Sequence, residues 1–63
     1  MYKLKERLEL KITQVEFAEK VGITPEFFSQ IQNGRSCSKM TAYAITKMYD
    51  ENKEITDLFE IEQ

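Results

Sequence analysis

Residues 13–34, TQVEFAEKVGITPEFFSQIQNG, decide the fold because they contain two short helix signals separated by only a few residues. Thr13 is followed three residues later by Glu16, a spacing typical of a capping box at a helix start. Thr24 predicts the second helix start, with Pro25 at the first helical position, where its missing N–H is not needed. Two helices of about eight residues, joined this tightly, are predicted to cross at a steep angle, as in a helix-turn-helix.

The two predicted helices also have suitable ends and a shared apolar side. Gly22 follows the first helix, and Asn33 with Gly34 ends the second, at positions where a left-handed residue is favoured. The apolar residues recur at three- and four-residue steps, so they can face one core. They are Phe17, Val21, Ile23, Phe28 and Ile31, while Ala18 is small where the two helices must approach most closely. The second helix keeps a polar face on its other side, and this face is the candidate for function.

Length and composition restrict the remaining possibilities. A chain of 63 residues predicts one domain, residues 1–63, with a small core. There is no apolar run near the length of a membrane span and no leader resembling a signal peptide, so we expect a cytoplasmic protein without a membrane partner. The chain has one cysteine, Cys37, and no histidine, so no metal, cofactor or catalytic constellation is expected. Cys37 is interpreted as a partly exposed or locally packed free thiol.

Charge is distributed unevenly along the chain. The net charge is −2, which does not suit a surface that binds polyanions everywhere. Residues 1–48 have eight basic and five acidic side chains, a balance of +3, whereas residues 49–63 have one basic and six acidic side chains, a balance of −5. One end of the molecule is therefore predicted to approach nucleic acid while the acidic end is held away.

The rest of the chain shows helical rather than alternating apolar spacing. Helices are predicted over residues 2–10, residues 39–49 with Ser38 as the cap, and residues 54–61. The fold class is therefore predicted to be all-α, a compact bundle of about five short helices. The inner stripe of the helix over residues 39–49 is predicted to consist of Met40, Ala44, Ile45 and Met48.

Several short motifs agree with a known family over nearly the whole chain. They are Arg7, Thr13-Gln14, Phe17-Ala18, Gly22-Ile23-Thr24, Ser29, Ile31, Asn33-Gly34 and Asp57-Leu58-Phe59. With these residues the chain resembles the phage repressor and Cro family of helix-turn-helix proteins, of the xenobiotic-response-element type. The resemblance implies a lambda-repressor-like DNA-binding domain whose second motif helix enters the major groove of operator DNA. It also implies a homodimer on double-stranded DNA, with half-sites about one helical turn apart.

The resemblance further implies which residues contact DNA. Gln30 is expected to be the main base reader, pairing with adenine. Glu26 is expected either to contact a base or only to place a favourable charge in the first turn of the helix. Phe27 is expected either to contact a base or to pack on the neighbouring helices. Gln14 has the alternative of a solvated first-turn residue. The full base-reading set is Pro25, Glu26, Phe27, Ser29 and Gln30. The expected phosphate contacts are Thr13, Gln14, Asn33, Arg35, Ser36, Ser38 and Lys39.

Two features leave alternatives open. Gln32 stands where the family commonly has a glutamate, which pairs with the arginine corresponding to Arg7. The amide keeps a hydrogen bond but removes the ion pair, so Arg7 either finds an acid such as Glu6 or Glu9, or turns toward DNA phosphate. The surplus apolar side chains of the last predicted helix form either a dimer surface or a closure of the core. They are Leu58, Phe59 and Ile61.

The sequence therefore predicts a small, non-enzymatic, sequence-specific DNA-binding transcriptional regulator, a Cro-like repressor of a phage or mobile element. No small-molecule ligand is expected. The alternative is a protein-binding module on the same fold, such as an antirepressor or an antitoxin-like partner, whose acidic C-terminal part docks a basic protein.

Overall fold

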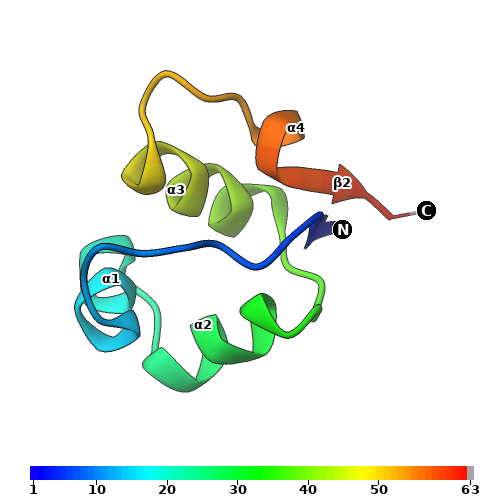
Figure 1. The fold of residues 1–63 in the computed structure, drawn as a ribbon. Coiled ribbons are helices and arrows are strands. Elements are labelled where there is room, and N and C mark those ends of the chain that lie inside the picture. Colours follow the sequence, from blue (N-terminus) through cyan, green and yellow to red (C-terminus); the bar gives the residue numbers. More distant parts are fainter. Residues whose placement is uncertain (63) are drawn as a thin grey trace.

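The computed structural model describes residues 1–62, in which four helices are combined with a two-stranded antiparallel sheet (Figure 1). The prediction of an all-α bundle is therefore wrong, and the fold is mixed α/β. In chain order the elements are β1 (Tyr2–Leu4), α1 (Gln14–Val21), α2 (Pro25–Gln32), α3 (Lys39–Tyr49), α4 (Ile55–Leu58) and β2 (Phe59–Ile61).

The central pair of helices, α1 and α2, is confirmed together with its caps. The hydroxyl oxygen of Thr13 accepts the N–H of Glu16 at 3.1 Å, and that of Thr24 accepts the N–H of Phe27 at the same distance. Gly22 is left-handed, with φ of 96°, and its N–H returns to the carbonyl of Ala18 at 2.8 Å. Local side-chain chemistry therefore fixes both helices and the turn between them. The two helices cross rather than run side by side (Figure 1).

The N-terminal segment is extended, so the predicted helix over residues 2–10 is wrong. Tyr2 pairs with Ile61 across the sheet, while its own N–H and C=O bond to Cys37 at 2.8 and 2.7 Å. Strand β1 therefore lies between Cys37 and β2, and the chain after it passes between α2 and α3 (Figure 1). Leu4 and Leu8 are both buried, as a helix would also bury them, but they enter the core from an extended chain.

The last predicted helix, over residues 54–61, is also only partly correct. Helix α4 has a single turn, whose start is held by Asp57, since its carboxylate accepts the N–H of Glu54 at 2.8 Å. The chain then becomes the strand β2, in which Phe59 is buried and Glu60 is exposed. Ile61 is exposed as well, so β2 shows no alternation of buried and exposed residues, and three residues are too few for a pattern to distinguish a strand from a helix.

The core lies between α1, α2, α3 and the sheet. The rings of Phe17 and Phe28 pack with their centroids 5.0 Å apart. The predicted inner stripe of α3 is only partly correct, because Ile45 is buried but Met40 is 84% exposed and Met48 is 44% exposed. The inward residues of α3 are Ala42, Ile45 and Thr46. Thr46 is tolerated there because its hydroxyl donates to the carbonyl of Ala42, at 2.8 Å.

Gln32 fastens the N-terminal segment to the end of α2. Its side-chain oxygen accepts the N–H of Leu8 at 2.8 Å, and its side-chain nitrogen donates to the carbonyl of Leu8 at 3.1 Å. The pair is buried, so both polar groups of the Leu8 backbone depend on this one amide. A glutamate at this position could accept the N–H of Leu8, but its second oxygen would face the carbonyl oxygen of Leu8 with no hydrogen to donate. The amide at this position therefore makes a specific backbone contact that a carboxylate could make only in part.

Gln32→Glu is expected to destabilise the fold by about 1–3 kcal/mol at neutral pH, because a carboxylate has no hydrogen to give the buried carbonyl of Leu8. Urea unfolding followed by circular dichroism measures this change. The matched control is Gln30→Glu, the same substitution at an exposed position of the same helix, which should alter stability by less than about 0.5 kcal/mol. Equal unfolding midpoints for the two variants would contradict the role given to Gln32.

The thiol of Cys37 is 1% exposed beside β1, which confirms the interpretation of a locally packed free cysteine. Burial raises the pKa of this thiol above its ordinary value of 9.0, and the positive amine of Met1 opposes the rise in part. Because the folded pKa exceeds the unfolded one, the neutral thiol contributes stability below the unfolded pKa. This contribution is lost as the pH rises through the folded pKa.

Raising the pH from about 8 to above the ordinary thiol pKa of 9.0 is therefore expected to lower the free energy of unfolding. Urea titrations at the two pH values measure the decrease. Cys37→Ala should have a lower starting stability and a smaller decrease between the two pH values. The prediction fails if the decrease is the same with and without the thiol.

Candidate nucleic-acid interface

The outward face of α2 forms one wall of a shallow surface groove, and the start of α1 forms the other. The volume of this groove is about 470 Å³. Four of the five predicted base-reading residues line it, together with the predicted phosphate contact Gln14. The lining residues are Gln14, Val15, Pro25, Glu26, Ser29 and Gln30. The opposite face of α2 is buried in the core through Phe28, Ile31 and Gln32, so the two faces of the helix are cleanly separated.

The exposed part of this face is suited to hydrogen bonding. Glu26 and Gln30 are exposed and lie four residues apart, so they project from neighbouring turns of one helix face. Pro25 and Ser29 are half-buried in the wall of the groove. Thr13 lies at the start of α1, as predicted, and its hydroxyl oxygen accepts the N–H of Glu16 as the cap of the helix. Gln14, which follows it, keeps its side chain in the groove wall.

Arg35 brings a positive charge onto α2. After Gly34, with φ of 106°, the chain reverses, and the N–H of Arg35 bonds to the carbonyl of Gln30 at 2.9 Å. This reversal lets the side chain of Arg35 return along the helix. Its Nη1 donates to Oε1 of Gln30, and its guanidinium lies 5.0 Å from the centroid of the Phe27 ring. Phe27 is half-buried, so it both packs on the fold and supports a cation.

Two further cations from the N-terminal segment reach the C-terminal end of α2. Nη1 of Arg7 donates to Oδ1 of Asn33 at 3.1 Å. A methylene carbon of Lys3 lies close to Gly34, 3.5 Å from the place that a Cβ would occupy there. Lys3, Arg7 and Arg35, which we call the basic cluster, thus lie against α2 or the turn that follows it, and positive charge near the end of a helix also complements its last carbonyls.

Lys3 is not among the residues that the sequence predicts to contact DNA, and for Arg7 a contact with DNA phosphate is one of the two alternatives that the sequence leaves open. Gln32 cannot form an ion pair, so Arg7 had to find another partner. The structure places it on the amide of Asn33 rather than on Glu6 or Glu9. The sequence carries no signal for Lys3, because its position depends on the pairing of β1 with β2.

The other predicted phosphate contacts lie between α2 and α3 or at the start of α3. The hydroxyl of Ser38 caps α3 by accepting the N–H of Thr41 at 3.3 Å, so it is engaged within the chain. Lys39 is exposed in the first turn of α3, and Ser36 is half-buried before it. Lys39 is therefore the residue of this segment that can best meet an anion.

The predicted dimer surface is divided by the fold. Phe59 is fully buried and closes the core, which is one of the two alternatives that the sequence left open. Leu58 is half-buried against the same core. Ile61 is 57% exposed, so of these three side chains it offers the most apolar surface to a partner.

The acidic part of the chain lies mainly away from the outward face of α2. The connection between α3 and α4 lies on the side of α3 opposite α2 (Figure 1). The final strand is an exception to a simple division of charge, since Glu60 pairs in register with Lys3. Nearby, Nζ of Lys5 donates to the carbonyl of Thr56 at 2.6 Å. The basic N-terminal and acidic C-terminal segments therefore hold each other in the fold.

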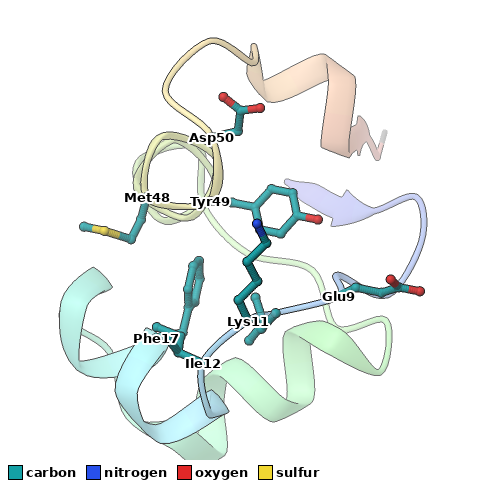
Figure 2. Close-up of a pocket in the computed structure, with 8 residues that line it drawn as sticks. Glu9, Lys11, Ile12, Phe17, Met48, Tyr49 and Asp50 are labelled. Atoms are coloured by element: carbon teal, nitrogen blue, oxygen red, sulfur yellow. The ribbon is translucent and has the colours of Figure 1, made fainter.

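A second groove, of about 390 Å³, lies between residues 9–12, α1 and the end of α3 (Figure 2). None of the predicted DNA-contacting residues lines it. Its walls combine apolar side chains such as Phe17 and Met48 with the charged Glu9, Lys11 and Asp50. Within residues 1–62, His, Cys, Asp and Glu side chains form no group of three that could hold a metal ion. In the same part of the chain, every helix is too short or too polar to cross a membrane.

Comparisons with protein-family models, with curated proteins and with solved structures give no match to this chain. The features of this chain that bear on its function are therefore the geometry of the α2 face and the basic cluster beside it.

Proposed function

We propose that the protein is a sequence-specific DNA-binding regulator that places the outward face of α2 in the major groove. The observation that carries this proposal is the combination of a polar helix face, which is lined by Glu26, Ser29 and Gln30, with Arg35 folded back onto it. A helix of eight residues is about 12 Å long, a length comparable to the width of the major groove.

Phosphate contacts on both sides would position this helix. Gln14 lies on one side of α2, at the start of α1, where free backbone N–H groups also favour an anion. Lys3 and Arg7 lie at the other end of α2, and Lys39 follows nearby in the chain. Such contacts fix orientation, while the side chains of the α2 face carry the sequence preference.

In its wider role, the protein would act in the cytoplasm as a Cro-like repressor of a phage or mobile element. A homodimer would cover palindromic operator DNA and exclude polymerase or a competing repressor. The half-sites would then be about 34 Å apart, one turn of the duplex.

The first experiment is a fluorescence titration of the protein with duplexes that tile the DNA flanking its own gene. One duplex should bind more tightly than its shuffled counterpart, and affinity should fall steeply with salt. No binding at low salt, or equal binding to all duplexes, would contradict the proposal.

Arg7→Glu is expected to weaken binding by at least about ten-fold at 0.1 M salt, because it removes one phosphate contact and adds repulsion. The matched control is Lys53→Glu, which changes the net charge equally but lies in the connection between α3 and α4. That variant should bind almost as tightly as the unmodified protein. Equal losses in both variants would show that only net charge matters.

A second candidate function is a protein-binding module, such as an antirepressor or antitoxin-like partner. The observation that favours it is the exposed Ile61 on the acidic final strand, beside Glu60 and Glu62. A basic partner would suit this edge of the molecule. Retention on a DNA or heparin resin at low salt favours the regulator, whereas no retention together with co-purification of a basic protein favours the module.

A further inference from the structure

The contact between Arg35, Gln30 and Phe27 suggests a more specific role for Arg35 than the expected phosphate contact. The guanidinium is held at two points, by the hydrogen bond to Oε1 of Gln30 and by the face of Phe27. Both of these residues belong to α2 itself. An exposed arginine that only neutralised phosphate would need no such support, because a phosphate contact tolerates many side-chain positions.

We propose that Arg35 reads a guanine in the major groove and that Gln30 and Phe27 are its positioning residues. This inference rests on the proposed function, since it requires α2 to enter the major groove. It assigns the main base contact to a residue that follows the helix in sequence but lies on the helix in space.

The choice of guanine follows from the donors that remain free. A guanidinium has five N–H donors, and the bond to Gln30 uses one nitrogen, Nη1. The other two nitrogens can still donate side by side. Guanine presents two neighbouring acceptors, O6 and N7, at its major-groove edge, and this is the base edge that a guanidinium fork matches best.

The same contact changes the expectation for Gln30. A bidentate pair with adenine needs the amide nitrogen to donate to N7 and the amide oxygen to accept from N6. Oε1 of Gln30 already accepts from Arg35. The arginine therefore occupies one of the two lone pairs of Oε1, so an adenine pair would have to share this oxygen, while the amide N–H donors of Gln30 stay available to a neighbouring base acceptor.

Phe27 reduces the freedom of Arg35 before DNA arrives. A guanidinium over an aromatic face is stabilised by the ring electrons, and its plane is restricted. This preorganisation suits the recognition of a planar base edge. Arg7 is the useful comparison, because its guanidinium bonds to Asn33 at the helix end and, among the described residues, lies over no aromatic ring.

The test is selection of binding sites from a randomised duplex library, followed by sequencing. The unmodified protein should select a guanine at a fixed position of each half-site. Arg35→Ala should lower the preference for that guanine by roughly 5- to 150-fold while other positions keep their preferences. Arg35→Lys keeps the charge but loses the fork, so it should also lose most of this preference.

Arg7→Ala is the matched control, since it removes an arginine from the same basic cluster. It should weaken binding to all sequences alike and reduce the slope of affinity against salt by about one. The inference is overturned if Arg35→Ala gives this same uniform loss with an unchanged base profile. If the unmodified protein binds DNA but selects no sequence, or does not bind DNA, the proposed function fails as well, so the two failures are distinguishable.

The positioning role of Phe27 has its own readout. Phe27→Leu retains apolar bulk but removes the aromatic face under Arg35. It should reduce the preference for guanine over the other bases while leaving the salt slope unchanged, because no charge is lost. An unchanged preference would remove Phe27 from the proposed reader.

Discussion

Phe28→Ala is expected to leave the protein largely unfolded at 25 °C. Phe28 is fully buried, and its ring packs against Phe17 with the centroids 5.0 Å apart. Truncating a buried phenylalanine to alanine costs about 3–5 kcal/mol, through lost burial and the cavity left behind. A domain of this size rarely has more than about 3–5 kcal/mol of net stability, so one such change removes most of it. Circular dichroism and a urea titration measure the outcome.

The adjacent residue offers a matched control. Phe27→Ala makes the same chemical change one position earlier in α2, where the side chain is only half-buried. This variant should unfold cooperatively with a clearly smaller loss of stability. If Phe28→Ala instead melts within a few degrees of the unmodified protein, the helix face assigned to the core is incorrect.

Sequence reasoning was most successful where a few neighbouring residues decide the structure. Thr13, Thr24 and Ser38 each cap a helix through a hydroxyl, and Gly22 ends α1 in the left-handed conformation. Each of these features depends on residues no more than about five positions apart, so the local pattern contains the information.

It failed where partners distant in the chain decide the structure. Residues Tyr2–Leu4 form a strand because β2 and Cys37 pair with them, and no short sequence pattern predicts that pairing. Leu4 and Leu8 have helical spacing, yet an extended chain that crosses the core buries both of them. The spacing of apolar residues can predict which residues are buried, but over so short a segment it does not predict whether the backbone is helical or extended.

The candidate site divides in the same way. The residues of α2 could be assigned to its outward face once the helix was fixed, because Phe28 and Ile31 define the buried side. The positions of Arg7 and Arg35 required the fold. Arg35 returns to the helix through the reversal at Gly34, and Arg7 arrives from a segment that Gln32 anchors. Both arginines are therefore placed by contacts that a linear pattern does not contain.

The double variant Gln30→Ala with Arg35→Ala is expected to weaken binding to the preferred duplex by roughly 100-fold, since a good base contact contributes about 1–3 kcal/mol and a positive charge is lost as well. The substituted side chains are both exposed, so folding should be retained, and thermal unfolding by circular dichroism checks this. Fluorescence titrations at a fixed salt concentration measure the affinity. Unchanged affinity would remove the proposed interface altogether.

The two single variants decide how the pair works. Independent contacts would give losses that add, whereas a residue that holds another gives a coupling of about 0.5–3 kcal/mol. Because Gln30 accepts from Arg35, we expect the double variant to lose less than the sum of the two single losses. Gln30→Ala should then weaken the guanine preference that belongs to Arg35. Additive losses would mean that each side chain meets DNA independently, so Gln30 would not be a positioning residue for Arg35.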